Sequence, residues 1–186
     1  MGTGGTVQEP DPQVISTARA GDRHAFGNLV RQCQGDVWRL VFHLVRDEGL
    51  ADDVTQDAFV RAYRFLPGYR ADSKFSTWLY SIARNCAMDE LRRVSRRRKV
   101  VERLEAEGPA TPTDHGAVLE VREAIAALPD DLREPVILID LLGTSYRDAS
   151  AILKTAEGTV KSRVHRGREA LADMLRPDEA RTHGEI

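Results

Sequence analysis

Near the C-terminus the sequence reads Gly158-Thr159-Val160-Lys161-Ser162-Arg163-Val164-His165-Arg166-Gly167-Arg168, with apolar and cationic side chains alternating at helical spacing. The apolar residues share one face of the predicted helix: Val160, Val164, Leu171 and Leu175. A second face collects cationic and hydrogen-bonding groups: Lys161, Ser162, His165 and Arg166. A helix with one buried side and one cationic side suits the major groove of DNA. The alternative is a basic helix whose charges only keep it solvated.

The residues before this helix predict three shorter helices, at 118–128, 131–142 and 145–153. Ser145 is placed to cap the last of these, and a short turn separates it from the basic helix. That spacing is typical of a helix-turn-helix unit. Residues 117–176 are therefore expected to form a small helical domain that binds DNA.

The first half of the chain predicts four more helices. They run from about Asp11 to Ala20, from Asp22 through a long apolar pattern to Val45, from Leu50 to Leu66, and from Ser76 or Thr77 into a basic block. Asp11 and Asp22 are expected to cap the first two of these helices. Pro67-Gly68 ends the third helix. Four helices with short connections form a bundle over residues 11–104. No stretch keeps the period-two alternation of a strand, so the expected fold class is all-α with two small domains.

Segments of different composition flank these domains. Residues 105–116, rich in Gly, Pro, Thr and Asp, predict a flexible linker between the two domains. Residues 1–10 and 177–186 are expected to be a disordered tail and a polar tail.

Charge is distributed unevenly along a chain of 186 residues whose net charge is only −2. The total excludes a general polyanion binder, but two basic segments and one acidic segment predict separate surfaces for different partners. The basic segments are the helix from Gly158 and a block of arginines from Arg92 to Arg103; the acidic segment runs from Asp36 to Asp57.

Several classes of protein are not supported by the sequence. No Cys/His cluster has the spacing of metal ligands, and no cofactor or catalytic residue is predicted. No apolar run spans a membrane and no secretory signal precedes the first helix, so we expect no membrane insertion and a cytoplasmic location. Cys33 and Cys86 fit buried free thiols, with a disulfide or a redox role as the alternative.

Two sets of residues resemble the extracytoplasmic-function (ECF) sigma factors of bacterial RNA polymerase. The set in the second half comprises Leu128-Pro129, Arg133-Glu134, Gly143, Ser145-Tyr146-Arg147-Asp148 and Gly158 to Arg163. In the first half, Asp52 to Phe59 is similar to the core-binding helix of that family. Phe75 to Asn85, with Asp89 and Arg92-Arg93, is similar to its strand-opening segment. The two sets stand in the family's order and span residues 11–175.

The resemblance implies a protein that confers promoter specificity and performs no bond chemistry. Implied contacts to the −35 element are Arg147, Thr159, Lys161, Ser162, Arg163, His165 and Arg166. Implied contacts to the −10 element are Asp72, Ser73, Lys74, Phe75, Trp78, Ser81, Asn85, Asp89, Arg92, Arg93, Arg96 and Arg97. Ser81, Asn85 and Asp89 are expected on one helical face, Trp78 fits either the core or the DNA face, and Tyr80 is expected to be exposed.

Implied partners are core RNA polymerase, through its clamp and flap regions, promoter DNA and an anti-sigma factor. Implied contacts to core polymerase are Asp52, Asp53, Gln56 and Asp57, whose alternative role is to favour the dipole at a helix N-terminus. Phe59 fits the core better than a contact.

The chain departs from the family pattern at the helix-turn-helix turn. Lys154 stands where the family usually has glycine, which costs on the order of 1 kcal/mol if the position requires a positive φ. Ala156 replaces a frequent proline, so Thr155 is expected to cap the recognition helix.

Two other functions remain open from the residues. One is a helix-turn-helix regulator that acts without polymerase and whose first domain senses a ligand or dimerises. The other is an enzyme or structural bundle with an incidental basic tail, which the missing catalytic constellation disfavours.

Overall fold

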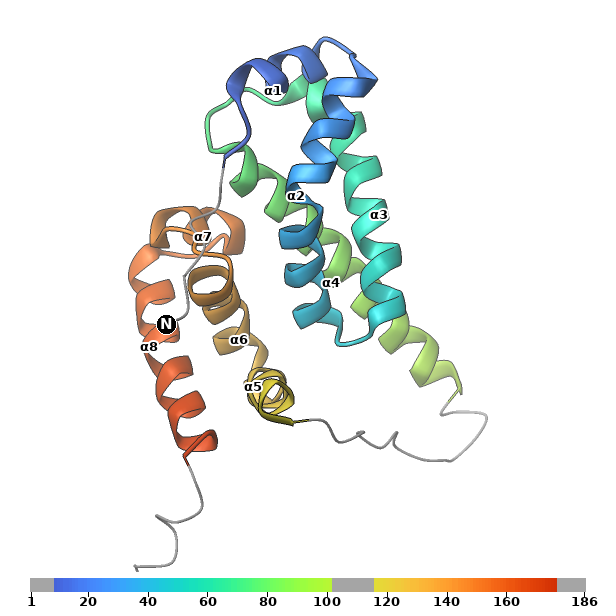
Figure 1. Ribbon diagram of the computed structural model, residues 1–186. Coiled ribbons are helices and arrows are strands. Elements are labelled where there is room, and N and C mark those ends of the chain that lie inside the picture. The colour runs from blue at the N-terminus through green and yellow to red at the C-terminus, as the bar shows by residue number, and fades with distance from the viewer. Residues whose placement is uncertain (1–8, 102–115, 177–186) are drawn as a thin grey trace, which may run out of the picture.

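The computed structural model describes residues 9–101 and 116–176, and within these ranges every regular element is a helix (Figure 1). The helices form an N-terminal group, α1 to α4, and a C-terminal group, α5 to α8. The predicted all-α class is confirmed. The predicted linker lies almost entirely outside the described residues, and only Gly116, the first residue of α5, falls inside them. No helix of the described ranges is long and apolar enough to cross a membrane.

The N-terminal group is a bundle of α1 (Pro12–Arg19), α2 (Arg23–Val45), α3 (Glu48–Phe65) and α4 (Phe75–Val101), with a 3₁₀ turn at Leu66–Gly68. Asp11, Asp22 and Asp47 cap the first three helices, each accepting backbone N–H bonds at 2.7 Å. Two of these caps were predicted. The third makes α3 begin earlier than Leu50, because Asp47 satisfies the amide of Leu50.

Small side chains allow α3 to approach the bundle closely. Ala51, Ala58 and Ala62 of α3 are fully buried, in the same core cluster as larger residues of α2 and α4 such as Val37 and Leu79. Cys33 and Cys86 are buried free thiols, as expected. Burial raises the pKa of Cys33 to about 12 and that of Cys86 to about 11, so both are neutral near pH 7.

The start of α4 corrects two sequence predictions. Ser76 and Thr77 do not precede the helix but are buried in its first turn, where Glu9 accepts hydrogen bonds from the Ser76 amide and hydroxyl. A carboxylate from the N-terminal segment thus caps α4. Tyr80, expected to be exposed, is only 1% exposed, and its hydroxyl donates to Asp36 at 3.4 Å.

The C-terminal group contains α5 (Gly116–Ala127), α6 (Asp130–Val136), a π-helical segment at Ile137–Leu141, α7 (Tyr146–Leu153) and α8 (Glu157–Met174). The single helix predicted at 131–142 is divided into two parts. Pro135 has no amide hydrogen to donate, and after it the helix changes to the wider π form, in which the Leu142 amide donates to the Ile137 carbonyl five residues earlier. Buried Arg133 holds the α5–α6 turn by donating to the Leu128 carbonyl at 3.0 Å.

The helix-turn-helix formed by α7 and α8 is confirmed. Ser145 caps α7 as expected, and Lys154 has φ 53°, the left-handed conformation that favours glycine. The expectation for Thr155 is wrong, since Ala156 occupies the N-cap of α8 without any side-chain bond. Leu175, expected on the buried face, is exposed, because α8 ends at Met174.

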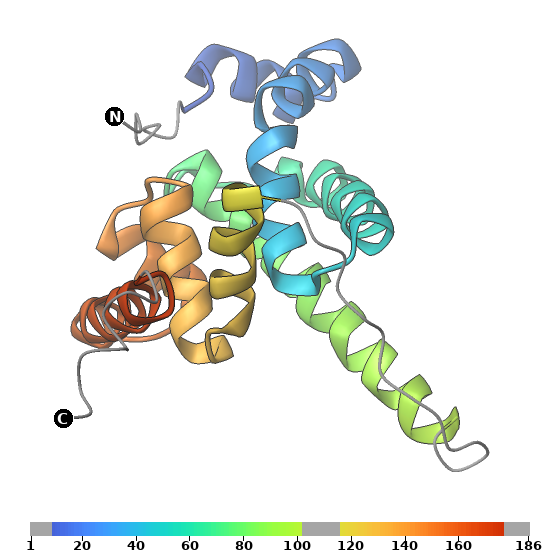
Figure 2. The ribbon, with the colours of Figure 1, turned by 60° about the horizontal axis from the view of Figure 1, so that its bottom comes forward.

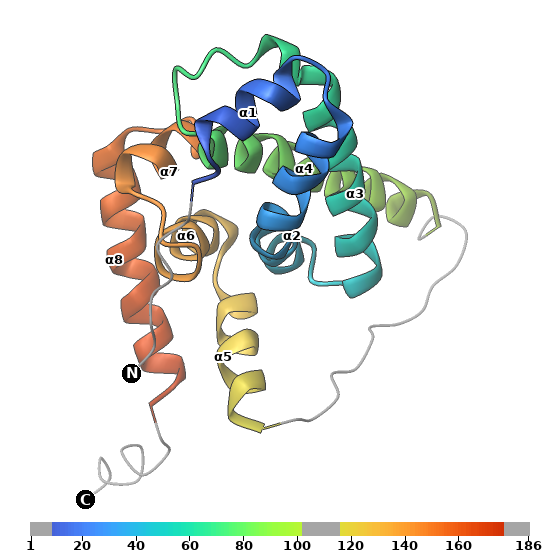
Figure 3. The same cartoon turned by 45° about the horizontal axis from the view of Figure 1, so that its top comes forward.

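The two groups are packed against each other through α4 and α7, which lie side by side in Figures 2 and 3. A second contact places the Arg122 guanidinium of α5 5.1 Å from the Phe42 ring of α2. In this arrangement, called closed below, the helix-turn-helix unit lies against the N-terminal end of α4.

Candidate nucleic-acid interface

The outward face of α8 carries the side chains predicted to read DNA. Val160 and Val164 are fully buried, and the same helix exposes Lys161, Ser162, His165 and Arg166. Lys161 pairs with Glu157 at 2.8 Å, an exposed contact that a phosphate can replace. Within residues 9–101 and 116–176, neither Arg166 nor exposed Arg147 has an ion-pair partner.

Other basic residues of α8 fix the helix in place. Arg168 donates to both carboxylate oxygens of Asp140, at 2.6 and 3.0 Å, and joins α8 to the π-helical segment. Arg163 is half-buried and reaches Asp131 at 4.0 Å. Gly167 is buried where a Cβ atom would stand 2.6 Å from Val136 of α6. Gly167 therefore allows the close approach of α8 and α6, which sequence reasoning did not anticipate.

The residues expected at the −10 element around the start of α4 differ in their exposure to solvent. Asp72, Ser73 and Lys74 are exposed, after Ala71 at φ 59°. Phe75, expected among the DNA contacts, is only 2% exposed and packs on Tyr69, so it supports the loop from the core. Trp78 is half-buried against the same two rings.

A groove of about 700 Å³ follows one side of α4. Its lining includes three residues predicted at the −10 element, Asn85, Arg92 and Arg96, together with Arg84, Met88, Leu91, Ser95 and Asp130. Ser81 lies one turn away, half-buried, with its hydroxyl bonded to the Thr77 carbonyl at 2.8 Å. Arg84 was missed as a candidate DNA contact, although its position next to Asn85 in α4 was a usable signal.

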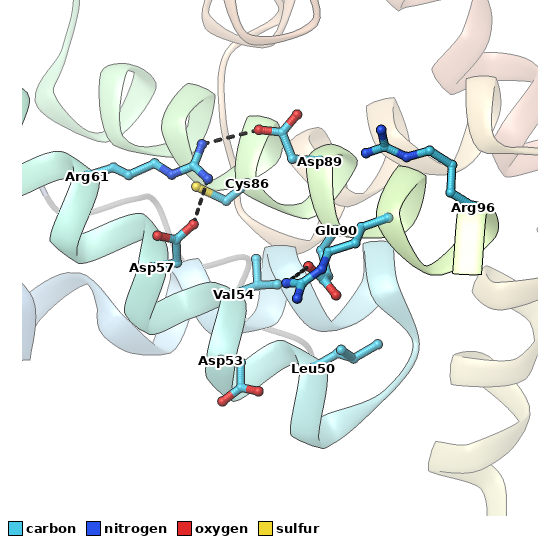
Figure 4. A pocket seen from close by; sticks show the side chains of 10 residues that line it. Leu50, Asp53, Val54, Asp57, Arg61, Cys86, Asp89, Glu90 and Arg96 are labelled. Atoms are coloured by element: carbon cyan, nitrogen blue, oxygen red, sulfur yellow. Dashed lines mark hydrogen bonds and ion pairs between the residues drawn. The ribbon is translucent and has the colours of Figure 1, made fainter. Parts of the chain in front are cut away.

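Asp89 lines a neighbouring pocket, on the side of α4 that is next to α3. This pocket, of about 470 Å³ between α3 and α4, contains Asp89 and Arg93 (Figure 4). There Arg61 bridges Asp57 at 2.9 Å and Asp89 at 3.2 Å, and the Cys86 thiol bonds to Asp57. Ser81, Asn85 and Asp89 follow one another at four-residue steps, which drift slowly around a helix of 3.6 residues per turn, so Asn85 lines the groove while Asp89 lines the neighbouring pocket beside α3.

The acidic part of α3 presents the predicted polymerase contacts to solvent. Asp52, Asp53, Gln56 and Asp57 are all exposed. Asp52 also accepts a hydrogen bond from the Trp38 indole at 2.7 Å, which fixes its carboxylate. Phe59 is half-buried against the core, as expected. Val60 and Tyr63 continue the exposed face of Gln56 with apolar surface, which the sequence interpretation had missed.

The charged side chains of the described ranges gather on three surfaces. No group of three or more His, Cys, Asp or Glu side chains within the described ranges is arranged to hold a metal ion. The cationic groups are spread along two helices, α4 and α8, and the exposed carboxylates of α3 form a third surface.

Comparison with protein families finds two matches in chain order. Residues 29–97 match the family "Sigma-70 region 2", and residues 119–171 match "Sigma-70, region 4". The first match contains α3 and most of α4, and the second contains α7 and most of α8.

Curated relatives cover nearly the whole chain. The RNA polymerase sigma-H factor of Pseudomonas aeruginosa is 36% identical, over 92% of this chain and 96% of that protein. The ECF RNA polymerase sigma-E factor of Escherichia coli K12 is 37% identical, over 91% and 96%. The ECF RNA polymerase sigma factor SigC of Mycobacterium tuberculosis is 38% identical, over 88% and 90%.

Two solved structures share this arrangement of helices. The sigma factor RpoE of Bartonella quintana, crystallised with the anti-sigma factor NepR, matches with a TM-score of 0.70 at 29% identity, over 81% of this chain and 96% of that one. CnrH, in complex with the cytosolic domain of CnrY, matches with a TM-score of 0.68 at 26% identity, over 88% and 95%.

Proposed function

The chain belongs to the ECF sigma factors of the sigma-70 family and directs promoter-specific transcription initiation with RNA polymerase, and from this premise we propose which residues do so. It is a specificity subunit and not an enzyme. From the same premise we propose that the protein is located in the cytoplasm. The N-terminal and C-terminal groups correspond in this proposal to sigma domain 2 (11–104) and sigma domain 4 (117–176).

The outward face of α8 reads the −35 element. Lys161, Ser162, His165 and Arg166 reach base edges or adjacent phosphates, while Arg147, Thr159 and Arg163 hold the DNA backbone. Arg166 is exposed and has no ion-pair partner within the described residues, so base reading is assigned chiefly to it. This exposed, unpaired arginine on a firmly seated helix is the observation that carries the assignment.

The exposed side of α4 and its preceding loop hold the −10 element as a single strand. Asn85 supplies hydrogen bonds to bases, and the loop Asp72 to Lys74 surrounds a base that has left the stack, which costs a few kcal/mol. Arg92, Arg93, Arg96 and Arg97 bind phosphates and give affinity rather than sequence preference. Phe75 and Trp78 support the loop. Asp89 acts indirectly, through its pairs with Arg61 and Arg92.

The exposed carboxylates of α3 and the amide of Gln56 dock on core polymerase, with Val60 and Tyr63 adding apolar area. The relatives crystallised with anti-sigma factors support an anti-sigma partner for this chain as well. Such a partner has to compete with polymerase and DNA for the surfaces described above.

Run-off transcription with purified core polymerase, with and without the chain, tests the whole assignment. Arg166→Ala is expected to cost about 1–3 kcal/mol of −35 binding on the matched site, whereas Arg96→Ala weakens binding on all sequences alike. The base-reading role of Arg166 is excluded if Arg166→Ala loses the same amount of binding free energy on matched and on scrambled −35 duplexes. A chain that binds the −35 duplex tightly but gives no transcript with core polymerase contradicts the proposed function.

A further inference from the structure

Two ion pairs join the C-terminal group to the cationic side of α4. Arg84 donates through Nε to Glu134 of α6 at 2.6 Å, and Lys74 donates through Nζ to Asp148 of α7 at 2.9 Å. The carboxylates are well covered, with 11% of the Glu134 side chain and 16% of the Asp148 side chain exposed. These pairs connect residues 50 and 74 positions apart, whereas Arg92 and Arg93 pair only with acids of their own helix.

The cations of these two pairs belong to the surface assigned to the −10 strand. Lys74 ends the loop before α4, and Arg84 lines the same groove as Asn85 and Arg92. A further carboxylate of α6, Asp130, stands in the wall of that groove. Three acids of the C-terminal group therefore face a surface that carries Lys74, Arg84, Arg92 and Arg96.

We propose that Arg84 is a phosphate-binding residue of the −10 surface, and that in the closed chain Glu134 and Asp148 take the positions on Arg84 and Lys74 that two DNA phosphates occupy. The inference rests on the proposed function, which places single-stranded DNA on α4. Guanidinium groups bind carboxylate and phosphate oxygens with the same geometry, so one anion substitutes for the other without moving Arg84.

The pair has to be exchanged rather than simply broken. Glu134 is buried and Arg84 is 23% exposed, so loss of one partner leaves a poorly solvated charge on the other. A phosphate that reaches Arg84 supplies the missing anion while Glu134 returns to water with the C-terminal group. Single-stranded DNA and the closed arrangement therefore compete for the same cations.

The closed arrangement leaves the other DNA surface open. Lys161, Ser162, His165 and Arg166 of α8 are exposed in the whole chain, and none of them faces α4. The free chain is thus expected to bind duplex DNA through α8 whether or not the groups separate, while single-strand binding depends on their separation.

Binding of two probes to the full-length chain without polymerase tests this competition. One probe is a fluorescent oligothymidylate of about 12 nucleotides, within the range of single-strand sites, and the other is a duplex of the same length. Glu134→Gln is expected to tighten oligothymidylate binding about tenfold, the size of one charge-assisted contact, and to leave duplex binding unchanged. The matched control is Glu123→Gln, which removes the same charge from an exposed position of α5 and should change neither.

The double variant Arg84→Ala/Glu134→Gln assigns the gain to Arg84. It is expected to lose the tighter oligothymidylate binding while duplex binding, which reports an intact C-terminal group, stays the same. The inference is overturned if Glu134→Gln behaves like Glu123→Gln, or if the double variant binds oligothymidylate as tightly as Glu134→Gln. The probe experiments contain no polymerase, so they test this inference alone. The proposed function is tested by run-off transcription, and its failure there is a separate result.

Discussion

Lys154 adopts a backbone conformation that a side chain makes costly. It ends α7 at φ 53°, and its amide closes the turn on the Ser150 carbonyl. A residue with a Cβ atom pays about 1 kcal/mol there, a penalty that glycine avoids. Nothing in its described contacts offsets that cost, because the side chain is exposed.

Lys154→Gly is therefore expected to stabilise the chain by about 0.5–1 kcal/mol, less than the full penalty because glycine also loosens the unfolded chain. Urea denaturation followed by circular dichroism measures the change. Lys154→Ala keeps the Cβ atom and removes the charge, so it should give little gain. Equal stability of the glycine and alanine variants would show that φ strain is not the cause.

Gly167 is a point of close approach between α8 and α6. A Cβ atom there would stand 2.6 Å from Val136 Cγ2, so Gly167→Ala has to displace the valine or the helix. We expect a loss of about 1–3 kcal/mol in unfolding free energy, typical of overpacking. Thermal unfolding and −35 duplex binding both report it.

Gly158 provides the matched control for Gly167. A Cβ atom at Gly158 meets nothing within 4 Å, and the residue lies in the first turn of the same helix. Gly158→Ala should therefore be neutral or slightly stabilising, since alanine favours helix. A second test adds Val136→Ala to Gly167→Ala, which should recover part of the loss if the clash is with that side chain.

At the scale of elements, α8 lacks the side-chain cap that α1, α2, α3 and α7 have. Asp11, Asp22, Asp47 and Ser145 each bond an amide of the helix they begin, whereas Ala156 leaves the first amides of α8 without a side-chain acceptor. Such a cap contributes about 1 kcal/mol.

Ala156→Ser is accordingly expected to stabilise the C-terminal group by about 1 kcal/mol and to strengthen −35 duplex binding modestly, by ordering the first turn of α8. Hydrogen exchange of the Gly158 and Thr159 amides is the sharper measurement, and protection should rise there first. Ala151→Ser, inside α7 and exposed, controls for the serine itself and should not stabilise. Unchanged protection in Ala156→Ser would contradict the capping argument.

The elements that sequence reasoning predicted well are those that depend on local information. The caps at Asp11, Asp22 and Ser145, and the buried valines of α8, follow from neighbouring residues and the period of a helix. Local errors remain at Thr155 and Pro135, and a second group of errors occurs where distant residues decide. Glu9 caps Ser76 across 67 residues, and Asp36 accommodates the buried Tyr80 hydroxyl across 44. The Arg84–Glu134 pair spans 50 residues, and no local pattern links them.

The whole molecule combines two exposed binding faces with one covered face. The acidic part of α3 and the outward side of α8 are open to solvent, whereas α6 and α7 cover the N-terminal end of the α4 surface that we propose for the −10 strand. Because the covering pairs are ionic, rising salt should favour separation of the groups while it weakens DNA binding to either one. Rising salt is thus expected to weaken both the packing of the two groups and the binding of DNA phosphates to α4.

His43 of α2 reports the separation of the two groups in the free chain. Burial lowers its pKa below 6.5, and the nearby Arg122 and Arg39 guanidinium groups lower it further. Arg39 belongs to α2 itself, but Arg122 comes from α5 and lies over the adjoining Phe42 ring only while the groups are closed. Since the folded pKa is depressed, the stability that neutral His43 contributes is complete above pH 6.5 and is lost as pH falls through the folded pKa.

Opening the chain should therefore raise the pKa of His43 toward 6.5, because Arg122 moves away while burial within α2 and Arg39 remain. Nuclear magnetic resonance titration of the His43 ring protons is expected to show this rise in Glu134→Gln and not in Glu123→Gln. The fall in unfolding free energy below pH 6.5 should be shallower in Glu134→Gln for the same reason. Identical His43 titration curves in the wild-type chain and Glu134→Gln would mean that the Arg84–Glu134 pair does not hold the groups together. Equal shifts in both variants would mean that net charge, rather than departure of Arg122, sets the pKa of His43.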